Sequence, residues 1–164
     1  IENMCVCYSS EYGVPVTIAR LAQTFGAGVS SEDTRVFAQF AHSAMNGEDI
    51  ILHTTGQSCG NYVYTADAAI AIFTLLKKGV NGECYTVANE ISSMQIKDMA
   101  KLVANCVANG KIRVVVDIPN EKQFGYAPEV KLKLDATKMQ ALGWKPQIDL
   151  EESYKRLIKY WQEN

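Results

Sequence analysis

The sequence has no long hydrophobic run and no excess of one charge. Its longest apolar stretch, residues 68–76, is interrupted by Thr74 and is far shorter than the roughly 20 residues that a membrane-spanning helix needs. The sequence contains 16 Lys and Arg residues and 18 Asp and Glu residues, so the net charge is −2, and no segment concentrates the basic side chains. We therefore expect neither a membrane protein nor a nucleic-acid-binding protein, and no secretory signal peptide is visible.

Metal-binding and disulfide patterns are also missing. No two cysteines form a Cys-x-x-Cys pair, and only two histidines are present. Cys5 and Cys7 lie two residues apart on a predicted helix, which places them on different faces. This usage predicts reduced, mostly buried thiols in a cytoplasmic protein without a metal site. The five cysteines are Cys5, Cys7, Cys59, Cys84 and Cys106.

Phosphate-binding loops and hydrolase motifs are absent as well. Gly26 and Gly28 have no third glycine at the spacing of a dinucleotide-binding loop, and no Gly-Lys-Ser or Gly-Lys-Thr sequence occurs. No Gly-x-Ser-x-Gly elbow supports a serine hydrolase. His42 lies off the apolar stripe of its predicted helix, whereas His53 ends a predicted strand beside a polar loop, where ligand-contacting residues are often found. An ordinary histidine at a strand end is the simpler interpretation of His53.

The sequence does have the composition of one globular domain. It contains 164 residues, of which 48% are hydrophobic and 21% are charged. These values are typical of a soluble domain with a packed core. Helical patterns alternate with short β-branched segments, which is typical of an α/β fold.

The N-terminal residues predict a helix without a start of its own. Residues 2–12 have a helical pattern ended by Gly13, and no Ser, Thr, Asp or Pro precedes them as a start signal. The apolar side chains of this helix point in several directions, so we expect it to need neighbours on more than one side and the chain to begin inside a helix. Residues 14–19 predict a short buried strand of a parallel sheet, and residues 23–31 predict a loop.

The rest of the chain alternates further helices and strands. Thr65 is expected to cap a helix, Ser92 and Gln95 have the spacing of a capping box, and Asp135 and Asp149 each resemble an N-cap. The irregular stretch 117–133 is long enough to carry a site. Helices are predicted for residues 36–46 and 65–78, from 92 to about 107, and after 135 and 149; strands are predicted for residues 50–53, 61–64, 83–88 and 112–116.

Four stretches of the sequence follow one another in a recognisable order. They are residues 8–21 (YSSEYGVPVTIARL, followed by Thr24, Phe25 and Gly26), residues 61–67 (NYVYTAD), residues 82–89 (GECYTVAN), and residues 135–138 (DATK) with 142–146 (LGWKP). In this order they resemble the extended short-chain dehydrogenase/reductase family, the NAD-dependent epimerases and dehydratases of nucleotide sugars. The second stretch looks like its Arg-Asp-Phe-Val-x-Val-x-Asp motif and the third like its Gly-Glu-x-Tyr-Asn-Val-Gly strand.

The resemblance covers the second half of that family's sequence. It implies an α/β fold that is the C-terminal portion of an extended enzyme of this family, with residues 1–28 as the last Rossmann helix and strand and residues 29–164 as the small mixed α/β substrate-binding domain. The NAD loop and the catalytic Tyr-x-x-x-Lys pair would precede the chain. The chain would hold no catalytic residue and be inactive alone, while its parent enzyme moves a hydride through NAD as an oxidoreductase, isomerase or lyase.

The resemblance also implies binding residues at family positions. Leu21 and Ala22 would lie at the nicotinamide end of the cofactor. Gln23, where an asparagine is common, would lie at the substrate phosphates. Leu52 and His53 would lie along the nucleotide base of a nucleotide-sugar substrate.

Two positions depart from the family pattern. Gly60 stands where many relatives have a phosphate-binding arginine, and Tyr126 stands where another arginine is usual. Tyr126 and Glu129 would belong to the loop that closes over the diphosphate. The missing arginines remove two charges that would hold a diphosphate bidentately, which puts the substrate class in question.

Two other functions are compatible with the same residues. The chain could come from a non-catalytic member of the superfamily that binds a ligand or a partner protein, or it could be an independent small α/β binding domain. The family resemblance implies a homodimeric parent. The same residues are compatible with an epimerase, a dehydratase, a decarboxylase or a reductase, and with more than one sugar and base.

Overall fold

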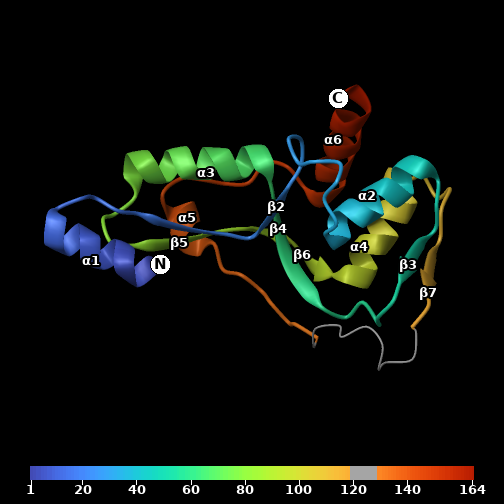
Figure 1. Ribbon diagram of the computed structural model, residues 1–164, viewed down its shortest axis with the longest axis horizontal. Helices are drawn as coiled ribbons and strands as arrows, with labels where there is room; N and C mark the ends of the chain where they lie inside the picture. Colours follow the sequence, from blue (N-terminus) through green and yellow to red (C-terminus); the bar gives the residue numbers. More distant parts are fainter. Residues whose placement is uncertain (119–128) are drawn as a thin grey trace.

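The structure is a computed structural model that describes residues 1–118 and 129–164. It is elongated, and helices pack around small β-sheets (Figure 1), so the predicted α/β class is confirmed. The helices are α1 (Glu2–Tyr12), α2 (Val36–Asn46), α3 (Thr65–Lys78), α4 (Ile96–Leu102), which continues as a π-helical turn over Val103–Val107, α5 (Thr137–Ala141) and α6 (Leu150–Glu163). The strands are β1 (Ile18–Leu21), β2 (Gln23–Phe25), β3 (Ile50–Leu52), β4 (Cys59–Tyr64), β5 (Cys84–Val87), β6 (Asn89–Gln95) and β7 (Val114–Val116).

The first sheet pairs β1 with β5 in parallel. Helix α1 precedes it and ends at Gly13, whose φ of 66° is left-handed and whose N–H donates to the carbonyl of Ser9. Glycine adopts this conformation without a Cβ clash, which ends the helix where the sequence predicted. Helix α3 runs along the same sheet (Figure 1).

Both strands of the first sheet lead into a second one. After Ala22 the chain continues as β2, which pairs in parallel with β4, and after Ala88 it continues as β6, which pairs antiparallel with β4. Strands β3 and β7 form a third, parallel pair. This pair lies at the opposite end of the molecule from α1 (Figure 1).

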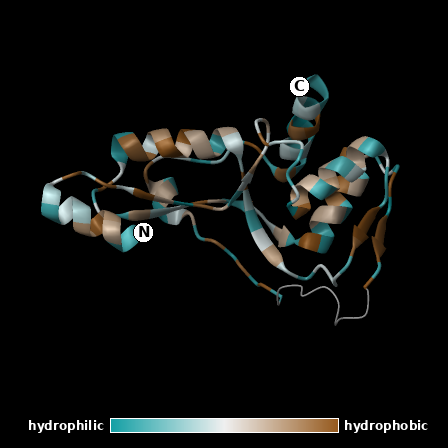
Figure 2. Ribbon diagram, viewed as in Figure 1, coloured by the Kyte–Doolittle hydropathy of each residue, from teal (hydrophilic) through white to brown (hydrophobic). Residues whose placement is uncertain are grey.

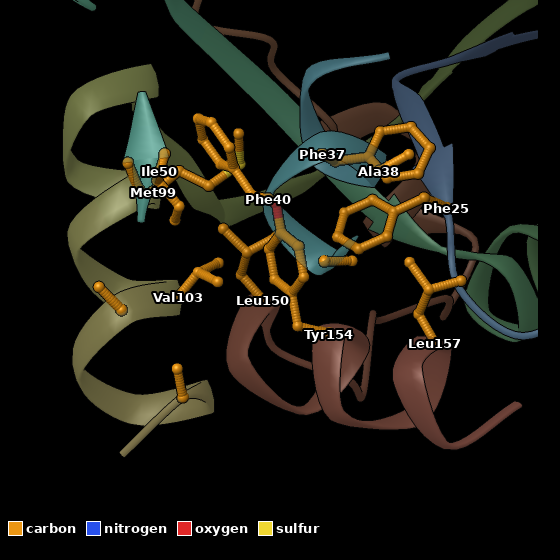
Figure 3. Close-up of a cluster of buried hydrophobic side chains, with 14 of the residues drawn as sticks. Phe25, Phe37, Ala38, Phe40, Ile50, Met99, Val103, Leu150, Tyr154 and Leu157 are labelled. Atoms are coloured by element: carbon orange, nitrogen blue, oxygen red, sulfur yellow. The ribbon is translucent and has the colours of Figure 1, made fainter. Parts of the chain in front are cut away.

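The larger hydrophobic core lies between α2, α4 and α6 (Figure 3). The rings of Phe25 and Phe37 stack with centroids 4.5 Å apart, and Tyr154 of α6 lies 5.1 Å from Phe25. Aromatic pairs at such distances stabilise a fold beyond the area they bury. Asp149 caps α6 because its carboxylate accepts a hydrogen bond from the backbone N–H of Glu152, as the sequence predicted.

A second core joins α3 to β4, β5 and α5. Asp67, in the first turn of α3, is buried, and its carboxylate accepts hydrogen bonds from the backbone N–H groups of Gln147 and Ile148 at 3.1 and 3.0 Å. The indole of Trp144 donates to the carbonyl of Asp67 at 3.0 Å. These bonds tie the chain before α6 to α3.

Several expected element boundaries are wrong. The predicted strand over residues 14–19 is observed four residues later, because the backbone N–H of Val16 donates to the side chain of Asn81 and its carbonyl accepts from Gly82, outside any strand ladder. Residues 23–25 are not a loop but strand β2, because their backbone pairs with residues 62–64 of β4. Both outcomes depend on partners distant in the sequence.

The predicted caps were right at one position and wrong at three. Ser92 lies in β6, and its hydroxyl donates to the carbonyl of Tyr62 and accepts from its N–H, so the helix begins later, at Ile96. Thr65 is already helical, and its hydroxyl donates to the carbonyl of Ala27. Asp135 accepts a hydrogen bond from the backbone N–H of Thr137, but Ala136 holds the cap position.

The thiols are less buried than predicted. All five cysteines are free, but Cys7 and Cys106 are exposed and the other three are half-buried. They lie on α1, on the π-helical turn and at the starts of two strands, where side chains do not enter either core.

Candidate functional site

The candidate site lies where two parallel strands leave the first sheet together. Strand β1 ends at Leu21 and strand β5 at Val87, and the N–H of Ala22 donates to the carbonyl of Val87 at 2.9 Å just past both ends. From there one strand continues into β2 and the other into β6. In α/β proteins, ligands bind outside the carboxyl ends of parallel strands where the chain direction diverges.

A cavity of about 560 Å³ opens at this point. Its walls come from the ends of β1 and β5, from the start of β4 and from the segment before α5. Four residues predicted from the family resemblance, Leu21, Ala22, Gln23 and Gly60, line it together. Its other lining residues are Arg20, Ser58, Cys59, Asn61, Tyr62, Thr86, Ile96, Leu132 and Leu134.

A second cavity of about 460 Å³ contains the other predicted pair, Leu52 and His53. Residues of α2 and β3 and the segments on either side of β4 line it. Ser58 and Ile96 line both cavities, so the two adjoin. The remaining walls are Val36, Gln39, Phe40, Ile51, Thr54 and Val130.

The segment after residue 128 contributes side chains to both cavities. Glu129 lines neither of them; its carboxylate accepts a hydrogen bond from the hydroxyl of Thr55 at 2.9 Å. The N–H of Val130 donates to the hydroxyl of Ser58, and its carbonyl accepts from the N–H of Cys59 at 2.7 Å. This strap places Val130 in the second cavity and Leu132 in the first.

The charges at the first cavity are paired. Arg20 makes a bidentate ion pair with Glu2 of α1, with N–O distances of 2.6 and 2.8 Å. The guanidinium lowers the pKa of Glu2, so both groups stay charged at neutral pH. Burial raises the pKa of Tyr62 to about 12, which keeps the phenol of this lining residue neutral.

Gly60 and Asn61, at the start of β4, line the first cavity without contributing a charge. A Cβ at Gly60 would contact the ring of Tyr62 at 3.5 to 3.7 Å, which is ordinary van der Waals distance, so the backbone does not require glycine here. Asn61 is buried, and its carbonyl oxygen accepts from the N–H of Leu134 at 2.8 Å. Its amide nitrogen has no hydrogen-bond partner in the part of the chain that the structure describes.

Sequence reasoning missed the residues that connect the two cavities. Ser58 precedes β4 and Ile96 begins α4, and neither belongs to a motif-like stretch. Their position between Gly60 and His53 arises from the pairing of β4 with β6. Tyr126, the remaining predicted substrate contact, lies outside the described residues.

Gly26 has a structural role that differs from phosphate binding. A Cβ there would lie 2.3 Å from the ring of Tyr64, and its φ of 146° is positive. Glycine is therefore required for the close approach of the chain to β4. In residues 1–118 and 129–164 no three His, Cys, Asp or Glu side chains are grouped so that they could hold a metal ion. No helix in the same ranges has the length and apolar character to span a membrane.

Comparison with known proteins indicates the family to which the chain is similar. A family model described as the NAD dependent epimerase/dehydratase family matches residues 1–89. The chain is 26% identical over 160 residues to human dTDP-D-glucose 4,6-dehydratase, covering 96% of this chain and 44% of the relative. It is 27% identical over 162 residues to UDP-glucuronic acid decarboxylase 1 of Xenopus tropicalis, covering 98% of this chain and 37% of that protein.

Solved structures share this fold. UDP-glucose 4-epimerase of Thermotoga maritima, crystallised with UDP-glucose, superposes with a TM-score of 0.82 at 25% identity, over 99% of this chain and 50% of the epimerase. The dTDP-glucose 4,6-dehydratase of Bacillus anthracis, solved with NAD, superposes with a TM-score of 0.77 at 18% identity, over 99% of this chain and 50% of the dehydratase. The chain thus spans about half the length of these proteins.

Proposed function

Since the chain belongs to the NAD dependent epimerase/dehydratase family, we propose that it is the C-terminal, substrate-binding portion of an enzyme that epimerises or dehydrates a nucleotide sugar. One observation carries the proposal: the cavity at the carboxyl ends of β1 and β5, which Leu21, Ala22 and Gln23 line, adjoins the cavity at the end of β3, which Leu52 and His53 line. These residues are up to 32 positions apart in the sequence (53 − 21).

The proposed cofactor contacts are few. Leu21 and Ala22 fit the edge of a nicotinamide site, because both are apolar and line the first cavity at the end of a parallel strand. Their side chains offer no group that binds a phosphate, so we propose that the other half of the parent holds most of the NAD and supplies the Tyr/Lys pair. NAD contributes hydride transfer to the reaction. On this proposal residues 1–28 belong to the NAD-binding domain and residues 29–164 to the substrate-binding domain.

The work of this chain is to position the substrate and exclude water. Gln23, two residues after Leu21 and in the lining of the first cavity, is proposed to hydrogen-bond the substrate phosphates, while Leu52 and His53 line the proposed base site. Glu129 is proposed to act on the substrate only indirectly, because its hydrogen bond with Thr55 holds the segment that begins at residue 129 in place. Closing a polar ligand between such walls strengthens each hydrogen bond made to it. Tyr126 is proposed to lie at the diphosphate.

Binding of UDP-glucose to the purified protein tests this proposal. Isothermal titration is expected to show binding of the native protein, and Gly60→Arg is expected to tighten it by about tenfold or more, because a charge-assisted hydrogen bond to phosphate contributes roughly 1.5 to 3 kcal/mol. Gln162→Arg, at an exposed position of α6, adds the same charge away from both cavities and is expected to change nothing. If native protein and Gly60→Arg both fail to bind, the proposal is wrong.

A non-catalytic member of the family is the second candidate. Gly60 favours it, since the first cavity has room for a side chain at this position and yet carries no arginine there. The two candidates differ in turnover. The longer parent protein is expected to convert a nucleotide sugar with NAD under the first proposal and to bind it without conversion under the second.

The assembly and location of the parent are also proposals. Apolar and aromatic side chains of α1 are exposed, with Met4 at 66% and Tyr8 at 59%. Such a surface fits the proposed homodimer of the parent, in which the helix continuing into α1 contributes to the interface. Analytical ultracentrifugation of the parent tests the dimer, and fractionation of source cells tests its proposed cytoplasmic location.

A further inference from the structure

His53 lines the second cavity, and one of its two ring nitrogens already makes a hydrogen bond. His53 follows β3, and its Nδ1 lies 3.1 Å from the carbonyl oxygen of Asp117. A carbonyl oxygen only accepts hydrogen bonds, so Nδ1 carries the hydrogen and donates. In the neutral ring the other nitrogen, Nε2, then carries a lone pair, and no residue of 1–118 or 129–164 donates a hydrogen bond to it. Since the ring lines the cavity, Nε2 is the nitrogen that remains for a ligand.

The same reasoning gives the cavity a second acceptor. The amide nitrogen of Gln39 donates to the carbonyl of Thr34 at 2.7 Å, which orients the amide and leaves its oxygen, Oε1, free to accept. Gln39 lines the same cavity as His53. Two side chains from different elements, α2 and the end of β3, therefore offer acceptors to one ligand.

Hydroxyl groups supply the complementary donors. The hydroxyl of Thr54 accepts from the N–H of Gly56 at 3.3 Å, and that of Ser58 accepts from the N–H of Val130 at 3.2 Å. Each hydroxyl uses a lone pair in these bonds and keeps its proton for donation. Apolar side chains, including Phe40, form the remaining walls. Apolar walls with a few polar groups at the edge suit a planar heterocycle.

We propose that His53 selects the base of the substrate by accepting a hydrogen bond at Nε2 from a ring N–H, as the imide of uracil or thymine offers. The imide presents one N–H between two carbonyls, and the second cavity offers an acceptor on His53 and hydroxyl donors on Thr54 and Ser58. Cytosine has a lone pair at the same ring position and is disfavoured, because two acceptors face each other. This inference depends on the proposed nucleotide-sugar binding and adds to it a residue that determines specificity.

The test compares uridine monophosphate with its N3-methyl derivative, which lacks the imide hydrogen. The native protein is expected to bind uridine monophosphate about tenfold more tightly, as the loss of one hydrogen bond predicts. Cytidine monophosphate is expected to bind as weakly as the methyl derivative. This part of the experiment needs no variant and so does not depend on the folding of one.

Two substitutions of His53 distinguish the contributions of its two ring nitrogens to binding. His53→Asn keeps a donor near the position of Nδ1 and removes Nε2, so the ratio between the two probes is expected to fall to about one. His53→Gln restores an acceptor near the position of Nε2 and is expected to recover most of the ratio. His42→Asn is the matched control, since His42 stacks on Trp161 and bonds the carbonyl of Ser31, outside the lining of either cavity.

The outcomes distinguish this inference from the proposed function. An unchanged ratio in His53→Asn, or equal binding of the three probes by the native protein, overturns the role of His53 while nucleotide binding stands. Absence of binding by uridine monophosphate and by UDP-glucose alike overturns both. Thermal unfolding of each variant, followed by circular dichroism, checks that it folds.

Discussion

The two ends of the molecule use the same residue types in opposite ways. Around α2 and α6, Phe37 and Leu157 are 1% and 0% exposed, whereas on α3 Phe73 and Leu76 are 70% and 78% exposed. Figure 2 shows hydrophobic residues along α3 as well as in the lobe that contains α2 and β3. The difference lies in what packs against each helix, because α2, α4 and α6 cover one another.

The open end also contains a hollow. A cavity of about 460 Å³ lies between β1 and α3, with Ala19 on one side and Ile72 and Leu76 on the other. Contiguous exposed apolar surface of this kind is uncommon on a soluble monomer and marks an interaction surface or a tendency to aggregate. The stability of the protein is therefore expected to respond differently to the same substitution in the closed lobe, formed by α2, α4 and α6, and at the open end, formed by α1, α3 and β1.

The largest expected effect contrasts two phenylalanines. Phe37→Ala is expected to lower the free energy of unfolding by about 3 to 5 kcal/mol, because it leaves a cavity beside Phe25 and Tyr154. Phe73→Ala is expected to change it by less than about 0.5 kcal/mol and to reduce aggregation. Urea denaturation of both variants measures the contrast. Equal losses would mean that the exposed face of α3 is covered in solution.

A smaller effect is expected from removing one hydroxyl. The hydroxyl of Tyr154 is buried without a hydrogen-bond partner in the described residues, and burial raises its pKa well above the ordinary value. Tyr154→Phe is expected to leave stability unchanged or to raise it by up to about 1 kcal/mol, since no unsatisfied polar group remains. Tyr12→Phe on exposed α1 is the control and is expected to have no effect. A loss above about 1 kcal/mol in Tyr154→Phe would show that the hydroxyl has a partner.

The smallest effect concerns ion pairs at the two ends. Asp49, before β3, accepts hydrogen bonds from the guanidinium of Arg113 and from its backbone N–H, which lower the pKa of Asp49 below its usual 3.8. A lowered folded-state pKa adds stability above the unfolded-state pKa, and this contribution is lost as the pH falls through the folded-state value.

Asp49→Asn is therefore expected to be slightly less stable than the native protein at pH 7, and the difference is expected to vanish below about pH 3. Thermal melts at both pH values measure it. Glu2→Gln, which breaks the pair with Arg20 at the open end, is the parallel variant, because Arg20 also lowers the pKa of Glu2. A difference that grows on acidification would contradict the assignment.

Local signals predicted the elements whose ends depend on neighbouring residues. Helix α2 ends at Asn46 because Gly47 adopts a left-handed φ of 72°, and α6 begins where Asp149 caps it. Predictions failed where a side chain had a distant partner. Ser92 and Gln95 have the spacing of a helix cap, yet the hydroxyl of Ser92 bonds Tyr62 across the sheet.

The residues of the candidate site were likewise predictable only in part from the sequence. Motif order in the sequence pointed to the family and, through it, to Leu21, Ala22, Gln23, Gly60, Leu52 and His53. Local pattern alone did not place these residues in adjoining cavities, since that arrangement requires the chain to pass from the first sheet into the second at Ala22 and Ala88. Composition and short-range periodicity established an α/β chain, because helix ends and strand propensity are set by nearby residues. Tertiary pairing decided that two cavities share Ser58 and Ile96 and that the carbonyl of Asp117 orients His53, because those contacts join segments far apart in the chain.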